Sequence, residues 1–153
     1  MALDGLDGIL AREMGQTSEF GAALDVLVDN ASRGGMWIVA LGLMGLPAVF
    51  LEMLVFACTH AEGGKAWKTG CFTKAPPTVA AVMRNGFRSP LGAITIAGLH
   101  FLPLWLWLSP RLPRRYSLAA GCLTLLLVSG RCLGAVVEVW VLGRHFGRIL
   151  RSD

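Results

Sequence analysis

Long apolar runs constrain this chain more than any other feature of its sequence. The clearest run begins at Met36 and ends near Cys58, and others lie within residues 78–109 and 116–142. Their apolar residues are bunched, and bunched runs of about 20 residues are typical of membrane-spanning helices. Only 16% of the chain is charged, against about 25% in an average soluble domain. We therefore predict one all-α membrane domain, a polytopic helix bundle, over residues 1–153.

Glycine and proline residues divide these runs into separate helices. Gly45 and Pro47 interrupt the first run, which is compatible with one kinked helix or with two helices joined by a tight turn. We favour two. The expected full membrane helices are about four in number, at residues 20–46, 47–60, 78–109 (with kinks at Pro90 and Pro103) and 116–142. A short helical piece is expected at residues 3–13.

The basic residues lie mostly at the ends of the apolar runs, as membrane proteins place them. The net charge of +4 therefore does not indicate nucleic acid, and we expect the lipid bilayer as partner instead. Residues 61–77 are predicted to be a polar loop with three lysines, and residues 144–153 a basic tail. We expect the tail in the cytosol, and a cytosolic position of both segments agrees with the positive-inside rule.

Four aspartates near the N-terminus follow a helical spacing. Asp4 and Asp7 are spaced i, i+3, and Asp25 and Asp29 are spaced i, i+4, so each pair shares one helix face. Two such faces opposed would bring four carboxylates into one small volume. Crowded carboxylates repel one another, and a divalent cation with a preference for oxygen ligands, Mg²⁺ or Mn²⁺, would neutralise them.

The residues around these aspartates suit a diphosphate group. Gly8 and Gly21 leave the backbone accessible, and Arg12 can neutralise phosphate oxygens. Four carboxylates could also hold two metal ions. An alternative remains open for Asp4 and Asp7, which could be first-turn acids that stabilise a helix dipole. Asp25 and Asp29 interrupt a stretch that leads directly into a membrane helix, where ionisable residues are functional candidates.

Residues 4–29 read D-x-x-D-G-x-x-A-R, then eight residues, then G-x-x-x-D-x-x-x-D. This pattern resembles the complete motif of the CDP-alcohol phosphotransferase (CDP-alcohol phosphatidyltransferase) family. The eight fixed positions are Asp4, Asp7, Gly8, Ala11, Arg12, Gly21, Asp25 and Asp29. Residues between them, such as Thr17, Ser18 and Phe20, are similar to phosphatidylinositol synthases and to bacterial-type phosphatidylserine synthases.

The resemblance implies a six-helix membrane enzyme of phospholipid biosynthesis. Such an enzyme moves a phosphatidyl-type group from a CDP-linked lipid donor, such as CDP-diacylglycerol, to a small alcohol and releases CMP. By the matched positions, the metal ligands would be Asp4, Asp7, Asp25 and Asp29. Asp29 would also be the catalytic general base on the alcohol. The CDP-binding residues would be Gly8, Ala11, Arg12 and Gly21.

The motif does not reveal the acceptor alcohol, and the similarity to phosphatidylinositol synthases makes inositol our leading candidate. The resemblance implies that basic residues of later helices would bind it, which singles out Arg84, Arg88 and Arg131. For Arg131 the alternative is a structural ion pair, because Glu138 follows two helical turns later on the same face. The resemblance further implies the endoplasmic reticulum or another internal membrane in a eukaryote, a site that faces the cytosol, and a homodimer among the expected assemblies.

The position of the motif supports a second hypothesis. In the family the first aspartate lies near the end of the second membrane helix, whereas here it is residue 4. We therefore expect the first helix and most of the second to be absent from this chain. The alternative function is a catalytically inactive, truncated relative that acts as a structural or partner protein in the membrane.

Overall fold

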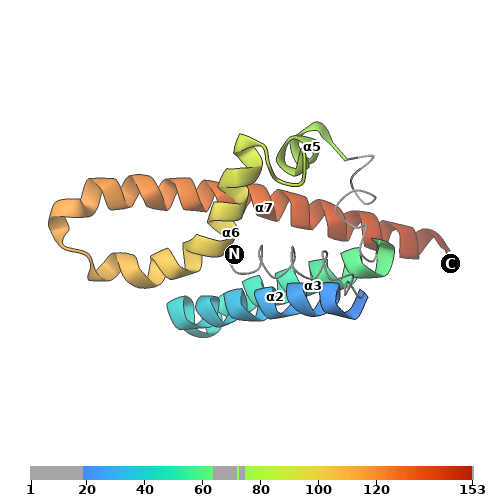
Figure 1. Cartoon of the computed structure of the whole chain (residues 1–153), viewed down its shortest axis with the longest axis horizontal. Helices are drawn as coiled ribbons and strands as arrows, with labels where there is room; N and C mark the ends of the chain where they lie inside the picture. The colour runs from blue at the N-terminus through green and yellow to red at the C-terminus, as the bar shows by residue number, and fades with distance from the viewer. Residues whose placement is uncertain (1–18, 64–71, 73–74, 153) are drawn as a thin grey trace, which may run out of the picture.

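The computed structural model describes residues 19–63, 72 and 75–152, and all of its regular elements in these ranges are helices (Figure 1). The predicted all-α class is therefore confirmed. The helices are α2 (Glu19–Leu41), α3 (Leu46–Gly63), α5 (Pro77–Met83), α6 (Pro90–Leu108) and α7 (Ser117–Ser152). Three short 3₁₀ turns join them: η1 (Gly42–Gly45), η3 (Ser109–Arg111) and η4 (Arg114–Tyr116). The expected helix at residues 3–13 lies outside the described ranges.

Helices α2 and α3 form an antiparallel hairpin, as predicted for two helices joined by a tight turn. The turn comes earlier than expected, because α2 ends at Leu41 rather than near Leu46. Gly42 adopts a φ of +60°, a left-handed conformation that glycine accepts without steric cost. Gly45 is buried, and a Cβ there would lie 2.5 Å from the carbonyl oxygen of Trp37. The two glycines allow the chain to reverse within four residues.

The prediction of a single helix over residues 78–109 is wrong, because the helix is interrupted between α5 and α6. Asn85, Gly86 and Phe87 have φ values of 53°, 65° and 66°, which no α-helix contains. The Oγ of Ser89 then accepts a hydrogen bond from the Gly92 backbone N–H at 3.0 Å. Pro90 occupies the first turn of α6, where its missing N–H costs nothing. The proline starts a new helix instead of kinking an existing one.

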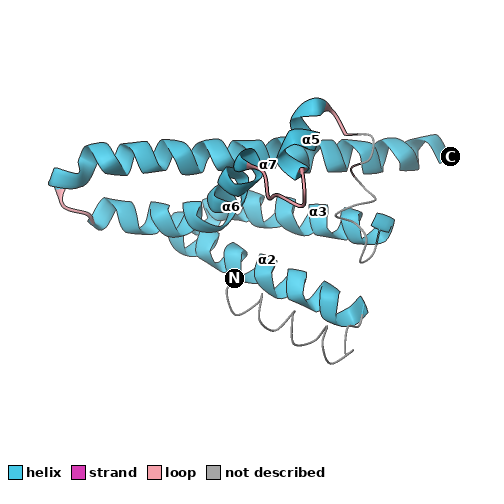
Figure 2. Ribbon diagram, turned by 45° about the horizontal axis from the view of Figure 1, so that its top comes forward, coloured by secondary structure: helices cyan, strands magenta, loops and turns pink. Residues whose placement is uncertain are grey.

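Pro103 lies inside α6, as expected, and Figures 1 and 2 show that this helix changes direction along its length. An interior proline removes one helical hydrogen bond and favours a kink. Helix α7 continues to Ser152, past the expected end at Leu142. At 1.5 Å per residue its 36 residues span about 54 Å, more than the hydrocarbon core of about 30 Å.

Helices α6 and α7 approach each other at glycines. A Cβ on Gly98 of α6 would lie 2.5 Å from the Leu127 carbonyl oxygen, and one on Gly130 of α7 would overlap the Ile94 carbonyl oxygen. Small residues let two membrane helices bring their backbones together and gain van der Waals contact. This contact needs glycine at both positions.

Two buried apolar clusters hold the bundle together. One joins α3, α5 and α7 through Cys58, Val79, Val82, Met83, Val137 and Val141. The other joins α2, α6 and α7 through Trp37, Leu102 and Leu127. Many other large apolar side chains are exposed, as expected for a bundle that faces lipid tails.

Three stretches of the described chain are long and apolar enough to cross a membrane: Phe20–Ala61, Pro90–Arg111 and Ser117–Arg151. The first of them contains the α2–α3 hairpin turn. The length and composition of these stretches make the chain a helical membrane bundle, in agreement with the sequence prediction.

Candidate active site

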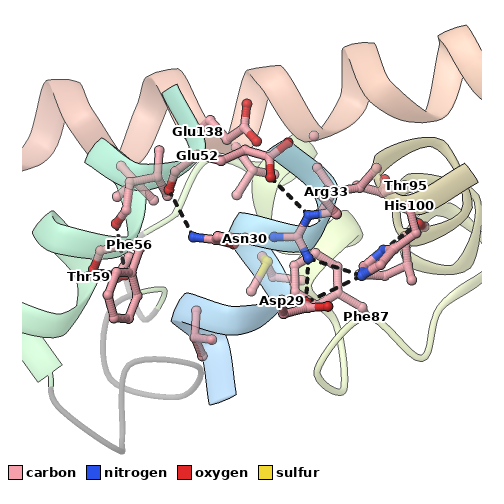
Figure 3. Close-up of a pocket in the computed structure, with 18 of the residues that line it drawn as sticks. Asp29, Asn30, Arg33, Glu52, Phe56, Thr59, Phe87, Thr95, His100 and Glu138 are labelled. Atoms are coloured by element: carbon pink, nitrogen blue, oxygen red, sulfur yellow. Dashed lines mark hydrogen bonds and ion pairs between the residues drawn. The ribbon is translucent and has the colours of Figure 1, made fainter. Parts of the chain in front are cut away.

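A cavity of about 330 Å³ lies among α2, α3, α6 and α7 (Figure 3). Apolar side chains such as Val55, Phe56 and Phe87 form part of its wall. Its polar lining comes from four separate helices: Asp25, Asp29, Asn30 and Arg33 on α2, Glu52 and Thr59 on α3, Thr95 and His100 on α6, and Glu138 on α7. The described lining therefore contains four carboxylates and one guanidinium.

Helix α2 brings three charged residues to this cavity because they recur every four residues. Asp25, Asp29 and Arg33 thus lie on successive turns of one face. The side chain of Asp29 is 41% exposed and that of Arg33 only 10%. Asp29 is therefore open to the cavity, whereas Arg33 is buried behind it.

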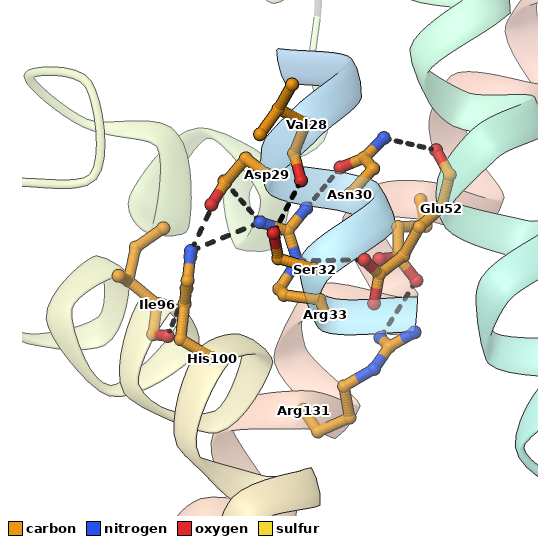
Figure 4. A network of polar contacts seen from close by, with 10 residues as sticks. Val28, Asp29, Asn30, Ser32, Arg33, Glu52, Ile96, His100 and Arg131 are labelled. Atoms are coloured by element: carbon orange, nitrogen blue, oxygen red, sulfur yellow. Dashed lines mark hydrogen bonds and ion pairs between the residues drawn. The ribbon is translucent and has the colours of Figure 1, made fainter. Parts of the chain in front are cut away.

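Arg33 is the centre of a polar network that joins α2 to α3 (Figure 4). Its Nη1 donates to Asp29 and its Nη2 donates to the side-chain oxygen of Asn30. Its Nε donates to the Oε2 of Glu52 at 2.9 Å. One planar guanidinium thus fixes two carboxylates from two helices, which is the geometry that arginine provides and lysine does not.

His100 of α6 extends the network to a third helix. Its Nδ1 lies 3.0 Å from the Ile96 carbonyl oxygen, which can only accept, so the hydrogen-bond partners assign the ring proton to Nδ1. The Nε2 lies 3.2 Å from Arg33 Nη1 and accepts from it, because a guanidinium only donates. The same Nε2 lies 3.5 Å from the Oδ2 of Asp29. The Asp29 carboxylate therefore lies next to both the Arg33 guanidinium and the His100 ring, as Figure 3 also shows.

The predicted acceptor residues lie outside the lining. Arg131 donates to the Oε2 of Glu138 at 2.8 Å, and their side chains are 12% and 11% exposed. The structural ion pair that was the alternative for Arg131 is therefore present. Arg84 and Arg88 are exposed residues of the segment between α5 and α6. None of the three arginines lines the cavity.

In the comparison with protein families, the CDP-alcohol phosphatidyltransferase family matches residues 1–125. This range contains the aspartate motif and extends into α7. The chain belongs to this family. The comparisons with curated proteins and with solved structures gave no match.

Membership of the CDP-alcohol phosphatidyltransferase family confirms the predicted class of function. The family consists of transferases of phosphate-containing groups that act in phospholipid synthesis, with a CDP-alcohol lipid donor and an alcohol acceptor in a membrane. Together with the three long apolar stretches, it identifies the chain as an integral membrane protein.

The structure describes three of the eight fixed positions of the family's motif. Gly21, Asp25 and Asp29 lie on α2, where Asp25 and Asp29 share the cavity. Asp4, Asp7, Gly8, Ala11 and Arg12 lie outside the described residues. Within residues 19–63, 72 and 75–152, no group of three or more His, Cys, Asp or Glu side chains could hold a metal ion.

The sequence analysis did not select Arg33, Glu52 or His100, which form the network around Asp29. Arg33 could have been found, because it continues the four-residue spacing of Asp25 and Asp29. Glu52 and His100 each stand in an apolar run, and an ionisable residue there is a functional candidate in a membrane protein. The spacing could not reveal that Glu52 and His100 both contact the guanidinium of Arg33.

Proposed function

We propose that this chain transfers a phosphatidyl group from a CDP-diacylglycerol-type donor to a small alcohol in a divalent-metal-dependent reaction that releases CMP. The observation that carries the proposal is the placement of Asp25 and Asp29 on one face of α2, at a cavity of about 330 Å³, in a chain that belongs to this family. Inositol is the leading candidate for the acceptor.

The two described aspartates of the motif fit a divalent cation. Asp25 and Asp29 supply oxygen ligands on adjacent turns, and oxygen is what Mg²⁺ and Mn²⁺ prefer. We propose that Asp4 and Asp7 complete the ligand set with them. When bound, the ion would neutralise the charge that develops on the diphosphate. Gly8, Ala11, Arg12 and Gly21 would bind the CDP portion, with Arg12 on a phosphate oxygen.

Residues of α2 and α6 would account for proton transfer from the acceptor and for the orientation of the group that takes the proton. Asp29 would accept the proton of the acceptor hydroxyl, since its carboxylate is the exposed member of the network. Arg33 would hold that carboxylate in one orientation, and the Nε2 of His100 would help to position Arg33 by accepting a hydrogen bond from it. The proposal further places the cavity on the cytosolic side of the endoplasmic reticulum or another internal membrane.

The test is an assay of membranes that contain the chain, with labelled CDP-diacylglycerol, a panel of alcohols, and either Mg²⁺ or Mn²⁺. We expect metal-dependent CMP release. The Asp25→Ala variant should lower the rate by about 100-fold or more, because even indirect contacts to a metal commonly contribute 10–100-fold. Ser32→Ala is the matched control, because Ser32 is an exposed residue of α2 that does not line the cavity.

Two outcomes would contradict the proposal. The first is equal rates for the wild type and Asp25→Ala, which would remove the metal role from Asp25. The second is the absence of metal-dependent CMP release with any acceptor, which would favour the alternative of a catalytically inactive membrane protein with a structural or partner role.

A further inference from the structure

Glu52 is a buried acid of the cavity whose carboxylate is only half satisfied. The residue is 6% exposed, and its side chain is 5% exposed. Its Oε2 accepts a hydrogen bond from Arg33, and its backbone carbonyl oxygen accepts one from the Nδ2 of Asn30 at 3.4 Å. Its Oε1 is buried and receives no hydrogen bond from the described residues. Helix α2 thus fixes Glu52 from two sides and leaves one oxygen for another donor.

A carboxylate oxygen without a donor is costly inside a protein, because it has lost its contacts with water. Glu138 is the neighbouring group and is close enough to interact electrostatically with Glu52. An ionised carboxylate only accepts hydrogen bonds, so Glu138 in that form cannot satisfy Glu52. Both acids line the cavity (Figure 3). A molecule bound in the cavity can therefore supply the donor.

The position of Glu52 relative to Asp29 defines what that molecule is. Arg33 contacts Asp29 through Nη1 and Glu52 through Nε, so the two carboxylates lie one guanidinium group apart. A small alcohol whose reacting hydroxyl meets Asp29 can present a second polar group to Glu52. That second group has to donate a hydrogen bond, because Glu52 Oε1 has only lone pairs to offer.

We propose that Glu52 selects the acceptor of the transfer reaction. Its Oε1 accepts a hydrogen bond from a second hydroxyl or from an ammonium group of the acceptor, and the site rejects acceptors that carry a phosphate or carboxylate of their own. The rejection follows from the charge where the acceptor would bind, since Asp29 and Glu52 share the single guanidinium of Arg33 there. The inference rests on the proposed function, and it narrows the acceptor to a small polyol or an ammonium alcohol.

The experiment compares the full chain with its Glu52→Gln variant in lipid nanodiscs, with myo-inositol, ethanolamine and inositol 1-phosphate as acceptors. In the variant an amide nitrogen takes the place of one oxygen, so the cavity presents a donor instead of an acceptor. We expect the KM of the preferred acceptor to rise about 10- to 100-fold, the factor that corresponds to a hydrogen bond to a charged group. The KM of the donor should not change. The preferred acceptor, inositol or ethanolamine, identifies the hydroxyl or the ammonium.

Trp37→Phe is the matched control. The Nε1 of Trp37 is also buried without a partner among the described residues, but Trp37 belongs to an apolar cluster and does not line the cavity. Removal of this polar atom should leave both KM values unchanged. Thermal unfolding of each variant separates a loss of acceptor contact from a loss of structure.

Equilibrium binding of labelled inositol and ethanolamine provides a readout that does not need turnover. If the wild type binds one of them more tightly than Glu52→Gln but releases no CMP, the proposed reaction fails and the acceptor site stands. Equal acceptor binding and equal KM in the two proteins would overturn the inference, even if the variant unfolds at a lower temperature. A wild type that prefers inositol 1-phosphate would overturn it as well.

Discussion

Helices α2 and α3 contact each other through charged side chains, whereas α6 and α7 contact each other at glycines, where no side chain separates the two backbones. In the first pair the Arg33 guanidinium contacts Asp29, Asn30 and Glu52. In the second pair Gly98 and Gly130 bring the two backbones so close that neither position accommodates a Cβ. We call the first contact the charged joint and the second the glycine joint. Both lie within the same bundle, and only the residues of the charged joint line the cavity.

The two joints differ in what they contribute to the molecule. A buried ion pair adds little net stability, because desolvation of its members offsets their attraction. Close backbone packing has no such cost, and it is a main source of helix association in lipid. We infer that the α6–α7 joint supports the fold, and that the α2–α3 joint is retained for the chemistry of the cavity.

The largest expected effect comes from breaking the charged joint at its centre. Arg33→Leu leaves Glu52 buried without its cation, and such a loss commonly costs about 3–5 kcal/mol. Chemical unfolding in detergent micelles measures the change in the free energy of unfolding. The same variant should lose transferase activity, because Asp29 loses the group that orients it.

The double variant Arg33→Leu/Glu52→Leu tests the reason for this loss. With both charges removed, most of the lost stability should return, because the cost lies in the unpaired carboxylate rather than in the missing bond. Activity should not return. A double variant as unstable as Arg33→Leu would show that the charged joint supports the fold after all.

The sequence predicted the charged region better than the glycine-packed one. Apolar runs indicated the helices, and the regular spacing of Asp25 and Asp29 indicated one face of α2, which is the face that meets the cavity. The glycines of α6 and α7 carried no comparable signal, because a glycine has the same letter whether it meets another helix or lipid. Gly121, for example, has open space around it, whereas Gly130 does not.

Local backbone conformation was a second limit of the sequence prediction. Pro90 is compatible with a kink inside one helix and with the start of a new one. The left-handed φ values of Asn85 and Phe87 decide for a new start. Asparagine before Gly86 is compatible with such a turn, but a bulky residue such as Phe87 rarely adopts a positive φ and does not indicate one. The link between Arg33, Glu52 and His100 is also three-dimensional, because these residues come from three different helices.

A smaller effect is expected at the glycine joint. Gly130→Ala adds one methyl group against the Ile94 carbonyl oxygen, and overpacking of this kind typically costs about 1–3 kcal/mol. Gly121→Ala is the matched control on the same helix. It should be neutral or stabilise the chain by up to about 1 kcal/mol, because alanine is the better helix former. Thermal unfolding in nanodiscs compares the two, and a Gly130→Ala variant as stable as Gly121→Ala would contradict close packing.

The smallest effect is expected at the corner between α5 and α6, where a polar group has a purely local task. The Ser89 hydroxyl accepts from the Gly92 N–H and donates to the Ala81 carbonyl oxygen at 2.9 Å. Ser89→Ala removes the cap of α6 and should cost about 1 kcal/mol. Ser89→Thr keeps both hydrogen bonds and is the control. Because Ser89 does not line the cavity, the KM values of both substrates should stay unchanged. A change in the acceptor KM would show that this corner, like the charged joint, affects the cavity. Polar groups of the site and polar groups of the fold could then no longer be treated as separate sets.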